Sequence, residues 1–175
     1  MTPHAPDARD FRAAMGTFAT GVTVVGTVTT DGFSATTANS FTSLSLAPRL
    51  VLVCLSTSSR TLSAILRATV FSVSVLSEDQ EDVSRRFAGR HRQPGWEAFA
   101  GTRFSLDGHG CPRLDESLAS FACRVHAVHE GGDHAILVGE VGAMLVRPGL
   151  DPLVFHDGGY RRLFGAPSYL GRLAS

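Results

Sequence analysis

The stretch FSATTANSFTSLSLAPRLVLVCLS, residues 33–56, decides the fold because it joins a polar segment to a strand of core residues. Its first half is rich in Ser and Thr, which suit a strand or a cap for local reasons. Its second half contains LVLVCL (50–55), an uncharged apolar run of strand length that predicts a strand covered on both faces. The sequence therefore predicts small hydroxyl and amide side chains directly before a buried strand.

Further strands surround this one. VTVVGTVTT (22–30) alternates at period two, and Asp31-Gly32 is a hairpin signal before residues 33–38. TVFSVSVL (69–76) reads as another alternating strand. A long hairpin is predicted over 117–130 and 135–146, and a short strand and turn over 152–163. The pattern favours a mainly β fold, a Greek-key or split antiparallel barrel with a few short helices.

Three helices and one loop are predicted between the strands. Asp7 is a suitable N-cap for a helix that runs until Gly21. Residues 56–68 read as a capped helix with Leu62, Ile65 and Leu66 on one side.

The third helix covers residues 77–89, where Ser77 and Gln80 form a capping-box pattern. The stretch GRHRQPGWEAFAG (89–101) has no clear period and contains Pro94 and Gly95. It is expected to be a mobile loop.

Length and charge limit the classes of protein. The length of 175 residues predicts a single domain over 1–175, with a core of about 11–164 and a flexible C-terminal tail, 165–175. Lys plus Arg and Asp plus Glu both number 16. Because the net charge is zero, the chain has no overall attraction to nucleic acid or to an anionic membrane. Small molecules and copies of the chain itself are therefore the expected partners.

The cysteines and the N-terminus predict a cytoplasmic protein. Cys54, Cys111 and Cys123 are widely spaced, which is typical of reduced thiols. The start MTPHAPDARDF lacks the basic and apolar regions of a signal peptide, and no apolar stretch has the length of a membrane span.

Hydroxyl groups gather around the predicted buried strand. STSSRT (56–61) lies at a helix start after that strand, where N–H groups and the helix dipole favour an anion. Arg60, Arg85 and Arg86 could add contacts to a phosphate. These hydroxyls bind a phosphate or a polar heterocycle in one reading, and they are strand and cap residues without a ligand in the other. No dinucleotide, P-loop, HExxH or GxSxG motif occurs.

Other candidate residues have local explanations. His126, His129 and His134 flank one hairpin, but residues 126 and 129 point to opposite faces of a strand, so no metal site is predicted. Trp96 and Phe99 suit a lid or loop anchors equally well. Cys54, in the middle of a buried strand, is assigned to core packing.

Five motifs in order resemble the short-chain flavin reductase family. They are TANSFTSLSLAPRLVLVCLS, SSRT before a helix, FSVSVLSEDQEDVSRRFAG, GGDHAILVGEV and PLVFHDGGYRRL, and the resemblance runs from about Phe11 to Tyr160. It implies an FMN-binding split barrel, usually a homodimer, which reduces FAD or FMN with NADH or NADPH. It also implies a flavin-dependent monooxygenase that receives the reduced flavin by diffusion.

The resemblance also implies site residues. The isoalloxazine and ribityl region would be lined by Thr36, Thr37, Asn39 and Ser40. The ribityl and phosphate groups would meet Ser56, Ser59, Arg60 and Thr61, with Arg86 and Phe87 beside the tail. The nicotinamide cofactor would contact His134 and Tyr160. Position 56 is Ser where the family often has an amide.

In such a site hydride passes directly between the two cofactors, so no catalytic side chain is predicted. Two alternatives remain open at this point. One is an electron carrier or storage module with tightly held FMN, and the other is an oxygenase or isomerase with a permanently bound flavin.

Overall fold

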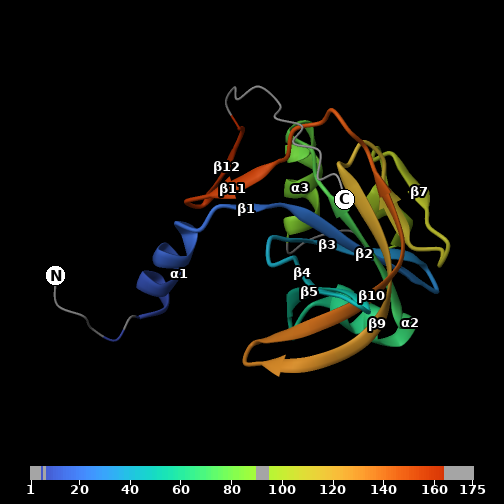
Figure 1. Cartoon of the computed structure of the whole chain (residues 1–175), viewed down its shortest axis with the longest axis horizontal. Coiled ribbons are helices and arrows are strands. Elements are labelled where there is room, and N and C mark those ends of the chain that lie inside the picture. Colours follow the sequence, from blue (N-terminus) through green and yellow to red (C-terminus); the bar gives the residue numbers. More distant parts are fainter. Residues whose placement is uncertain (1–4, 6, 90–94, 164–175) are drawn as a thin grey trace.

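One seven-stranded antiparallel sheet dominates the computed structural model, which describes residue 5 and residues 7–89 and 95–163 (Figure 1). The strand order is β3-β2-β6-β9-β10-β5-β4. Their bounds are Thr23–Thr29 (β2), Gly32–Ala38 (β3), Thr42–Leu46 (β4), Arg49–Ser56 (β5), Val70–Val75 (β6), Ala119–Gly131 (β9) and His134–Val146 (β10). The sheet curls around a core, with consecutive strands β3 and β4 at its opposite edges. The predicted mainly β split barrel is confirmed.

Five short strands form two further sheets. They are β1 (Thr20–Gly21), β7 (Phe104–Leu106), β8 (Pro112–Leu114), β11 (Val154–His156) and β12 (Gly159–Arg161). Because β1 pairs with β11, a segment near the N-terminus is fastened to one near the end of the described chain. The predicted final strand is in fact a hairpin of β11 and β12. The pair β7 and β8 was not predicted, because runs of three residues carry no recognisable period.

The first helix, α1 (Ala8–Gly16), starts where predicted. The Asp7 carboxylate accepts hydrogen bonds from the N–H groups of Arg9 and Asp10 at 2.8 Å. The helix stops at Gly16 rather than near Gly21, because residues 20 and 21 pair with β11. None of its side chains is buried, and it projects away from the barrel (Figure 1).

The second helix, α2 (Arg60–Ala68), covers one side of the barrel interior. Leu62 and Ile65 are buried as predicted, but Leu66 is 47% exposed, so its assignment to this face was wrong. The buried face is completed by Thr61 and Ala64 instead. Residue 66 lies about 100° around the helix from Ile65, which turns it toward solvent.

The barrel interior is an apolar cluster. Its fully enclosed members include Val25, Val53, Ile65, Phe71 and Leu137. The prediction that both faces of β5 are covered was wrong for the single chain. Val51, Val53 and Leu55 are buried there, whereas the alternating residues Leu50, Leu52 and Cys54 remain partly exposed.

β6 shows the opposite departure, since residues on both of its faces are buried. The hydroxyl of Ser72 donates to the carbonyl of Pro112, and the N–H of Leu114 donates to the hydroxyl of Ser74. The short strand β8 therefore covers the face of β6 that the alternating pattern assigned to solvent.

The third helical segment consists of a 3-10 turn, η1 (Glu78–Gln80), and α3 (Glu81–Ala88). The predicted capping box is present, with the N–H of Ser77 donating to Oε1 of Gln80 at 3.1 Å. Within the described residues, no helix combines the length and apolar character needed to cross a membrane.

The predicted mobile loop is partly helical. Residues 95–99 form a 3-10 helix, η2 (Gly95–Phe99), while residues 90–94 and the predicted tail 165–175 lie outside the described residues. Phe99 is buried in a second core with Phe33 and Phe87, and the Trp96 ring meets that of Phe33 edge-on at 4.5 Å. Both aromatic residues therefore anchor η2 on β3.

Candidate functional site

A groove of about 650 Å³ opens where three strands and two helices have their ends. It lies at the end of β3, the end of β5, the first residue of β10, the start of α2 and the end of α3. Its lining residues are Thr36, Thr37, Ala38, Asn39, Ser40, Cys54, Leu55, Ser56, Ser58, Ser59, Arg60, Ala88, Gly89 and His134. The fold thus brings most of the predicted site residues into one cavity, although they are far apart in sequence.

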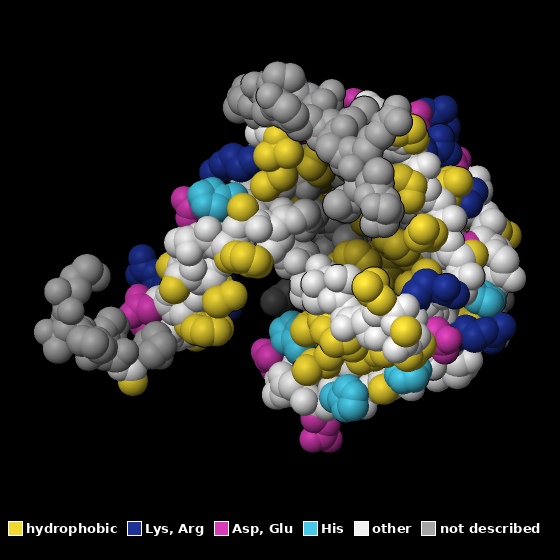
Figure 2. Space-filling model, in the orientation of Figure 1, with side chains coloured by type: hydrophobic (Ala, Val, Ile, Leu, Met, Phe, Trp, Pro, Cys, Tyr) yellow, Lys and Arg dark blue, Asp and Glu magenta, His cyan; other side chains and the backbone are white. Residues whose placement is uncertain are grey.

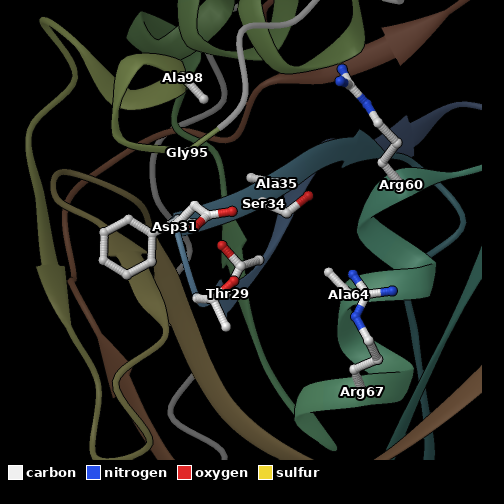
Figure 3. A pocket seen from close by; sticks show the side chains of 11 residues that line it. Thr29, Asp31, Ser34, Ala35, Arg60, Ala64, Arg67, Gly95 and Ala98 are labelled. Carbon is white, nitrogen blue, oxygen red and sulfur yellow. The ribbon is translucent and has the colours of Figure 1, made fainter.

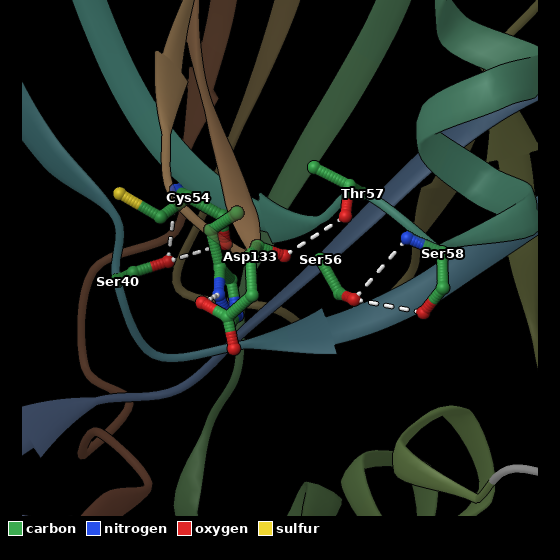
Figure 4. A network of polar contacts seen from close by, with 7 residues as sticks. Ser40, Cys54, Ser56, Thr57, Ser58 and Asp133 are labelled. Carbon is green, nitrogen blue, oxygen red and sulfur yellow. Dashed lines mark hydrogen bonds and ion pairs between the residues drawn. The ribbon is translucent and has the colours of Figure 1, made fainter.

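Strand pairing places His134 beside the hydroxyl groups. In the register of β10 with β5, His134 lies opposite Ser56. The carbonyl of Asp133 accepts hydrogen bonds from the N–H of Thr57 at 3.0 Å and from its hydroxyl at 3.1 Å (Figure 4). The turn before His134 is therefore fastened to the loop that leads into α2.

Ser40 has a structural contact of its own. Its hydroxyl donates to the carbonyl of Cys54 at 2.9 Å and accepts from the N–H of the same residue at 3.0 Å (Figure 4). The pairing of β4 with β5 stops at Leu52. The side chain of Ser40 thus takes the place of a strand partner at Cys54 and fixes one wall of the groove.

The start of α2 forms the polar end of the groove. The hydroxyls of Ser56 and Ser58 lie 2.9 Å apart, and the Ser59 hydroxyl accepts from the N–H of Leu62 at 3.4 Å. First-turn N–H groups and the helix dipole attract an anion, and Arg60 adds a positive charge there. Leu55 and Ala38 supply apolar surface. The groove thus fits a flat, polar-edged ligand that carries a phosphate.

Two predicted residues are enclosed instead of lining the groove. Thr61 is fully buried, and its hydroxyl lies 3.0 Å from that of Ser34, which ties α2 to β3. Phe87 is also fully buried, in the second core. Their side chains support the walls of the site from behind.

Two other predicted residues point elsewhere. Arg86 donates from Nη1 to the carbonyl of Ala100, which holds α3 to the segment after η2. The hydroxyl of Tyr160 lies 2.7 Å from that of Ser84 on α3, and the guanidinium of Arg85 lies 4.8 Å from the centre of the Tyr160 ring. Neither Arg86 nor Tyr160 lines the groove.

Sequence reasoning missed several lining residues, notably Cys54, and it included Ser58 only as part of the stretch 56–61. Cys54 was assigned to the core, yet it is partly exposed and lies in the groove. The signal was available, because residues 54 and 56 share one face of a strand and Ser56 was already a candidate. Ala88 and Gly89 carry no chemical signal in the sequence.

A hydrogen bond between His134 and Asp133 lies at the open edge of the groove. Nδ1 of His134 lies 2.8 Å from Oδ1 of Asp133, and this hydrogen bond lowers the pKa of the Asp133 carboxyl. An ionised carboxylate has no proton to give, so Nδ1 is the donor and Nε2 is the nitrogen left for a ligand. Over the described residues, no three His, Cys, Asp or Glu side chains come together as a metal site.

The three thiols should differ sharply in reactivity. Burial raises the pKa of Cys111 to about 11 and that of Cys123 to about 12, and both side chains are fully enclosed. Because the thiolate is the reactive form, we expect a disulfide reagent such as DTNB to modify only Cys54 in the folded protein. All three thiols should react in guanidinium chloride, and Cys54→Ser should remove the fast reaction. Rapid modification of two or more thiols in the folded state would contradict this assignment.

A family model and known relatives match nearly the whole chain. The model described as flavin reductase like domain matches residues 15–163. FMN reductase (NADH) SmoA of Agrobacterium fabrum is 42% identical over 93% of this chain and 90% of its own length. HsaB of Mycobacterium tuberculosis, named as the reductase subunit of a flavin-dependent monooxygenase, is 40% identical over 88% of this chain and 81% of its own length.

One relative is longer, and a solved structure shares the fold. A Rhizobium meliloti protein named "Probable flavin reductase" is 44% identical over 91% of this chain, which spans only 50% of that protein. The NADH:FAD oxidoreductase SgcE6 of Streptomyces globisporus has a TM-score of 0.87 and 36% identity, covering 95% of this chain and 99% of its own. The chain belongs to the flavin reductase-like family.

Proposed function

We propose that the protein is a flavin reductase, which uses NADH, or NADPH, to reduce FAD or FMN and releases the reduced flavin. The observation that carries this proposal is the groove, which brings hydroxyl groups, a helix start and His134 together. The names of the relatives agree with this activity. The flavin supplies the redox chemistry when bound, since it accepts hydride from the nicotinamide.

The chain itself would bind and orient the flavin and the nicotinamide cofactor. The start of α2 and Arg60 hold the flavin phosphate, and the groups at the end of β3 meet the polar edge of the ring. Leu55 and Ala38 give the ring an apolar wall. His134 orients the nicotinamide cofactor from the edge of the groove. No side chain needs to move a proton, because the residues of the groove would only hold and orient the two cofactors, which supply the hydride chemistry themselves.

Steady-state turnover tests this function. A reductase should oxidise many equivalents of NADH, under nitrogen, when free flavin is in large excess over protein. An electron carrier with tightly held FMN would stop after one reduction per bound flavin, and that result would refute the proposal. An organic product formed by the protein alone would instead indicate an oxygenase or isomerase.

The partner is a flavin-dependent monooxygenase that takes up reduced flavin by diffusion. The name of HsaB supports a partner of this kind. The groove is open to solvent along His134, which is 48% exposed, so an exchanging flavin has a route out. The three free thiols fit a reducing compartment, and we place the protein in the cytoplasm.

The protein acts as a homodimer in this proposal. Apolar side chains that the single chain leaves exposed lie on β4, on the β9–β10 hairpin and on α1 (Figure 2). Leu46 is 89% exposed, Met144 68% and Phe11 59%. Surfaces of this kind are typical of contacts between protein chains. Sedimentation at micromolar concentration should show a dimer, and a monomer would refute this part of the proposal.

Substitutions of Asn39 and Ser40 should have different effects, the first on flavin binding and the second on the stability of the fold. Asn39 is exposed and lies in the groove, so Asn39→Ala should weaken flavin binding by about 0.5–1.5 kcal/mol with little change in the free energy of unfolding. Ser40→Ala should lower the free energy of unfolding by about 1–3 kcal/mol, because it removes both bonds to Cys54. Flavin fluorescence titration and urea unfolding measure the two effects. An unchanged flavin affinity in Asn39→Ala would refute its placement.

A further inference from the structure

A second cavity, of about 210 Å³, adjoins the groove along α2. Its walls come from the β2–β3 hairpin, from α2 and from η2. We call it the arginine pocket because Arg60 and Arg67 both line it. Arg60 also lines the groove, so the two cavities meet at this residue. A ligand that fills the groove as far as Arg60 therefore arrives at the arginine pocket.

The two arginines are arranged along one side of the helix. They are seven residues apart, which is two helical turns or roughly 10 Å of rise. In Figure 3 both project from α2 on the side that faces Asp31 and Ser34 of the hairpin. Ala64 lies between them on α2, and its small side chain takes up little of the pocket. The pocket thus has one arginine, Arg60, in common with the groove and a second, Arg67, two turns farther along α2.

The side chains of the pocket match a phosphate joined to a nucleoside. Among the described lining residues, two guanidinium groups and one carboxylate, that of Asp31, give an excess of positive charge, and guanidinium groups pair well with phosphate oxygens. The carboxylate of Asp31 and the hydroxyl of Thr29 suit the hydroxyls of a ribose, as acidic residues do in other nucleotide sites. Ala35 and Ala98 add apolar surface.

We propose that the arginine pocket receives the adenylate half of FAD, so that this chain binds FAD more tightly than FMN. The inference rests on the proposed function, which places the flavin in the groove with its phosphate at Arg60. FMN ends at that phosphate, whereas FAD continues with a second phosphate and adenosine. Arg67 therefore contacts FAD alone.

The substitution Arg67→Ala tests this inference by binding, without catalysis. We expect the dissociation constant for FAD, measured by quenching of flavin fluorescence without nicotinamide, to rise about tenfold, and that for FMN to change less than twofold. Arg67→Lys keeps the charge but loses the planar donor pair, so its dissociation constant for FAD should lie between those of the wild type and Arg67→Ala. Arg124→Ala is the matched control, because Arg124 is an exposed arginine on β9 that lines neither cavity.

Adenylate also occurs in the nicotinamide cofactor, and the experiment separates the two sources. Unchanged FAD binding with a raised Michaelis constant for NADH would assign the pocket to the nicotinamide cofactor and overturn the inference. An equal loss of FAD and FMN affinity would overturn it too. A wild-type protein with equal affinity for both flavins refutes this inference alone, whereas one that binds neither refutes the proposed function as well.

Discussion

Replacing His134 by Ala should lower kcat/KM for NADH by a few-fold to a hundredfold while leaving the flavin dissociation constant nearly unchanged. His134 lines the open edge of the groove opposite Ser56, and Asp133 holds its Nδ1 at 2.8 Å. That contact leaves Nε2 to accept from a nicotinamide amide or, once protonated, to donate to a phosphate. Such hydrogen bonds contribute about 1–3 kcal/mol, which sets the expected range.

Two controls separate a role in binding from a role in folding. His126→Ala changes an exposed histidine on β9 outside the groove and should leave both constants unchanged. Asp133→Ala removes the partner that orients the ring and should give part of the loss. Weakened flavin binding in His134→Ala would move this residue to the flavin side, and unchanged kinetics would leave it a turn residue.

The hydrogen bond between His134 and Asp133 also predicts a pH dependence. The hydrogen bond from His134 lowers the pKa of the Asp133 carboxyl. A depressed carboxyl pKa means that the contact is complete above the usual range for aspartate and is lost as the pH falls through the lowered value. In wild type the orientation of His134 should therefore persist through neutral and mildly acidic pH. Asp133→Ala should lack this contribution across the whole range.

The sequence could predict the walls of the site because local patterns encode them. Alternation and the Asp31-Gly32 turn indicated β2 and β3, and residues 56–68 indicated a capped helix, whose cap the structure places at Ser59. The resemblance then supplied roles for Asn39, Ser40 and His134 that patterns do not contain. These residues meet in space because β5 pairs with both β4 and β10, and pairing between distant strands leaves no local signal.

The remaining differences come from tertiary contacts. Burial of Phe87 and Thr61 depends on which elements cover α3 and α2, and no period reports that. The hydroxyl-rich face of β6 looks solvated, yet β8 bonds to Ser72 and Ser74. The apolar run of β5 predicts that Leu50 and Leu52 are core residues. The single chain buries only the opposite face of this strand.

Replacing Gly139 by Ala should destabilise the protein by about 3 kcal/mol, the upper part of the usual range for overpacking. Gly139 lies in the middle of β10, and a Cβ atom there would stand 2.3 Å from Cζ of Phe71 and 3.2 Å from Cβ of Cys123. Phe71 is fully enclosed in the barrel interior, among the other buried side chains of the core. Either its ring leaves its rotamer or β10 shifts away from β5 and β9, and both changes cost free energy.

Gly142→Ala, three residues along the same strand, is the matched control. A Cβ atom at that position would meet only the carbonyl of Ala122, at 3.9 Å, which is an ordinary contact. Its free energy of unfolding should change by less than about 0.5 kcal/mol. For a domain of this size, a loss of 3 kcal/mol corresponds to a Tm lower by about 6–12 °C, which calorimetry resolves easily. Equal stability of the two variants would mean that Phe71 does not pack against β10 as described. Because β10 begins at His134, the same shift should also weaken NADH binding in Gly139→Ala and leave it intact in Gly142→Ala.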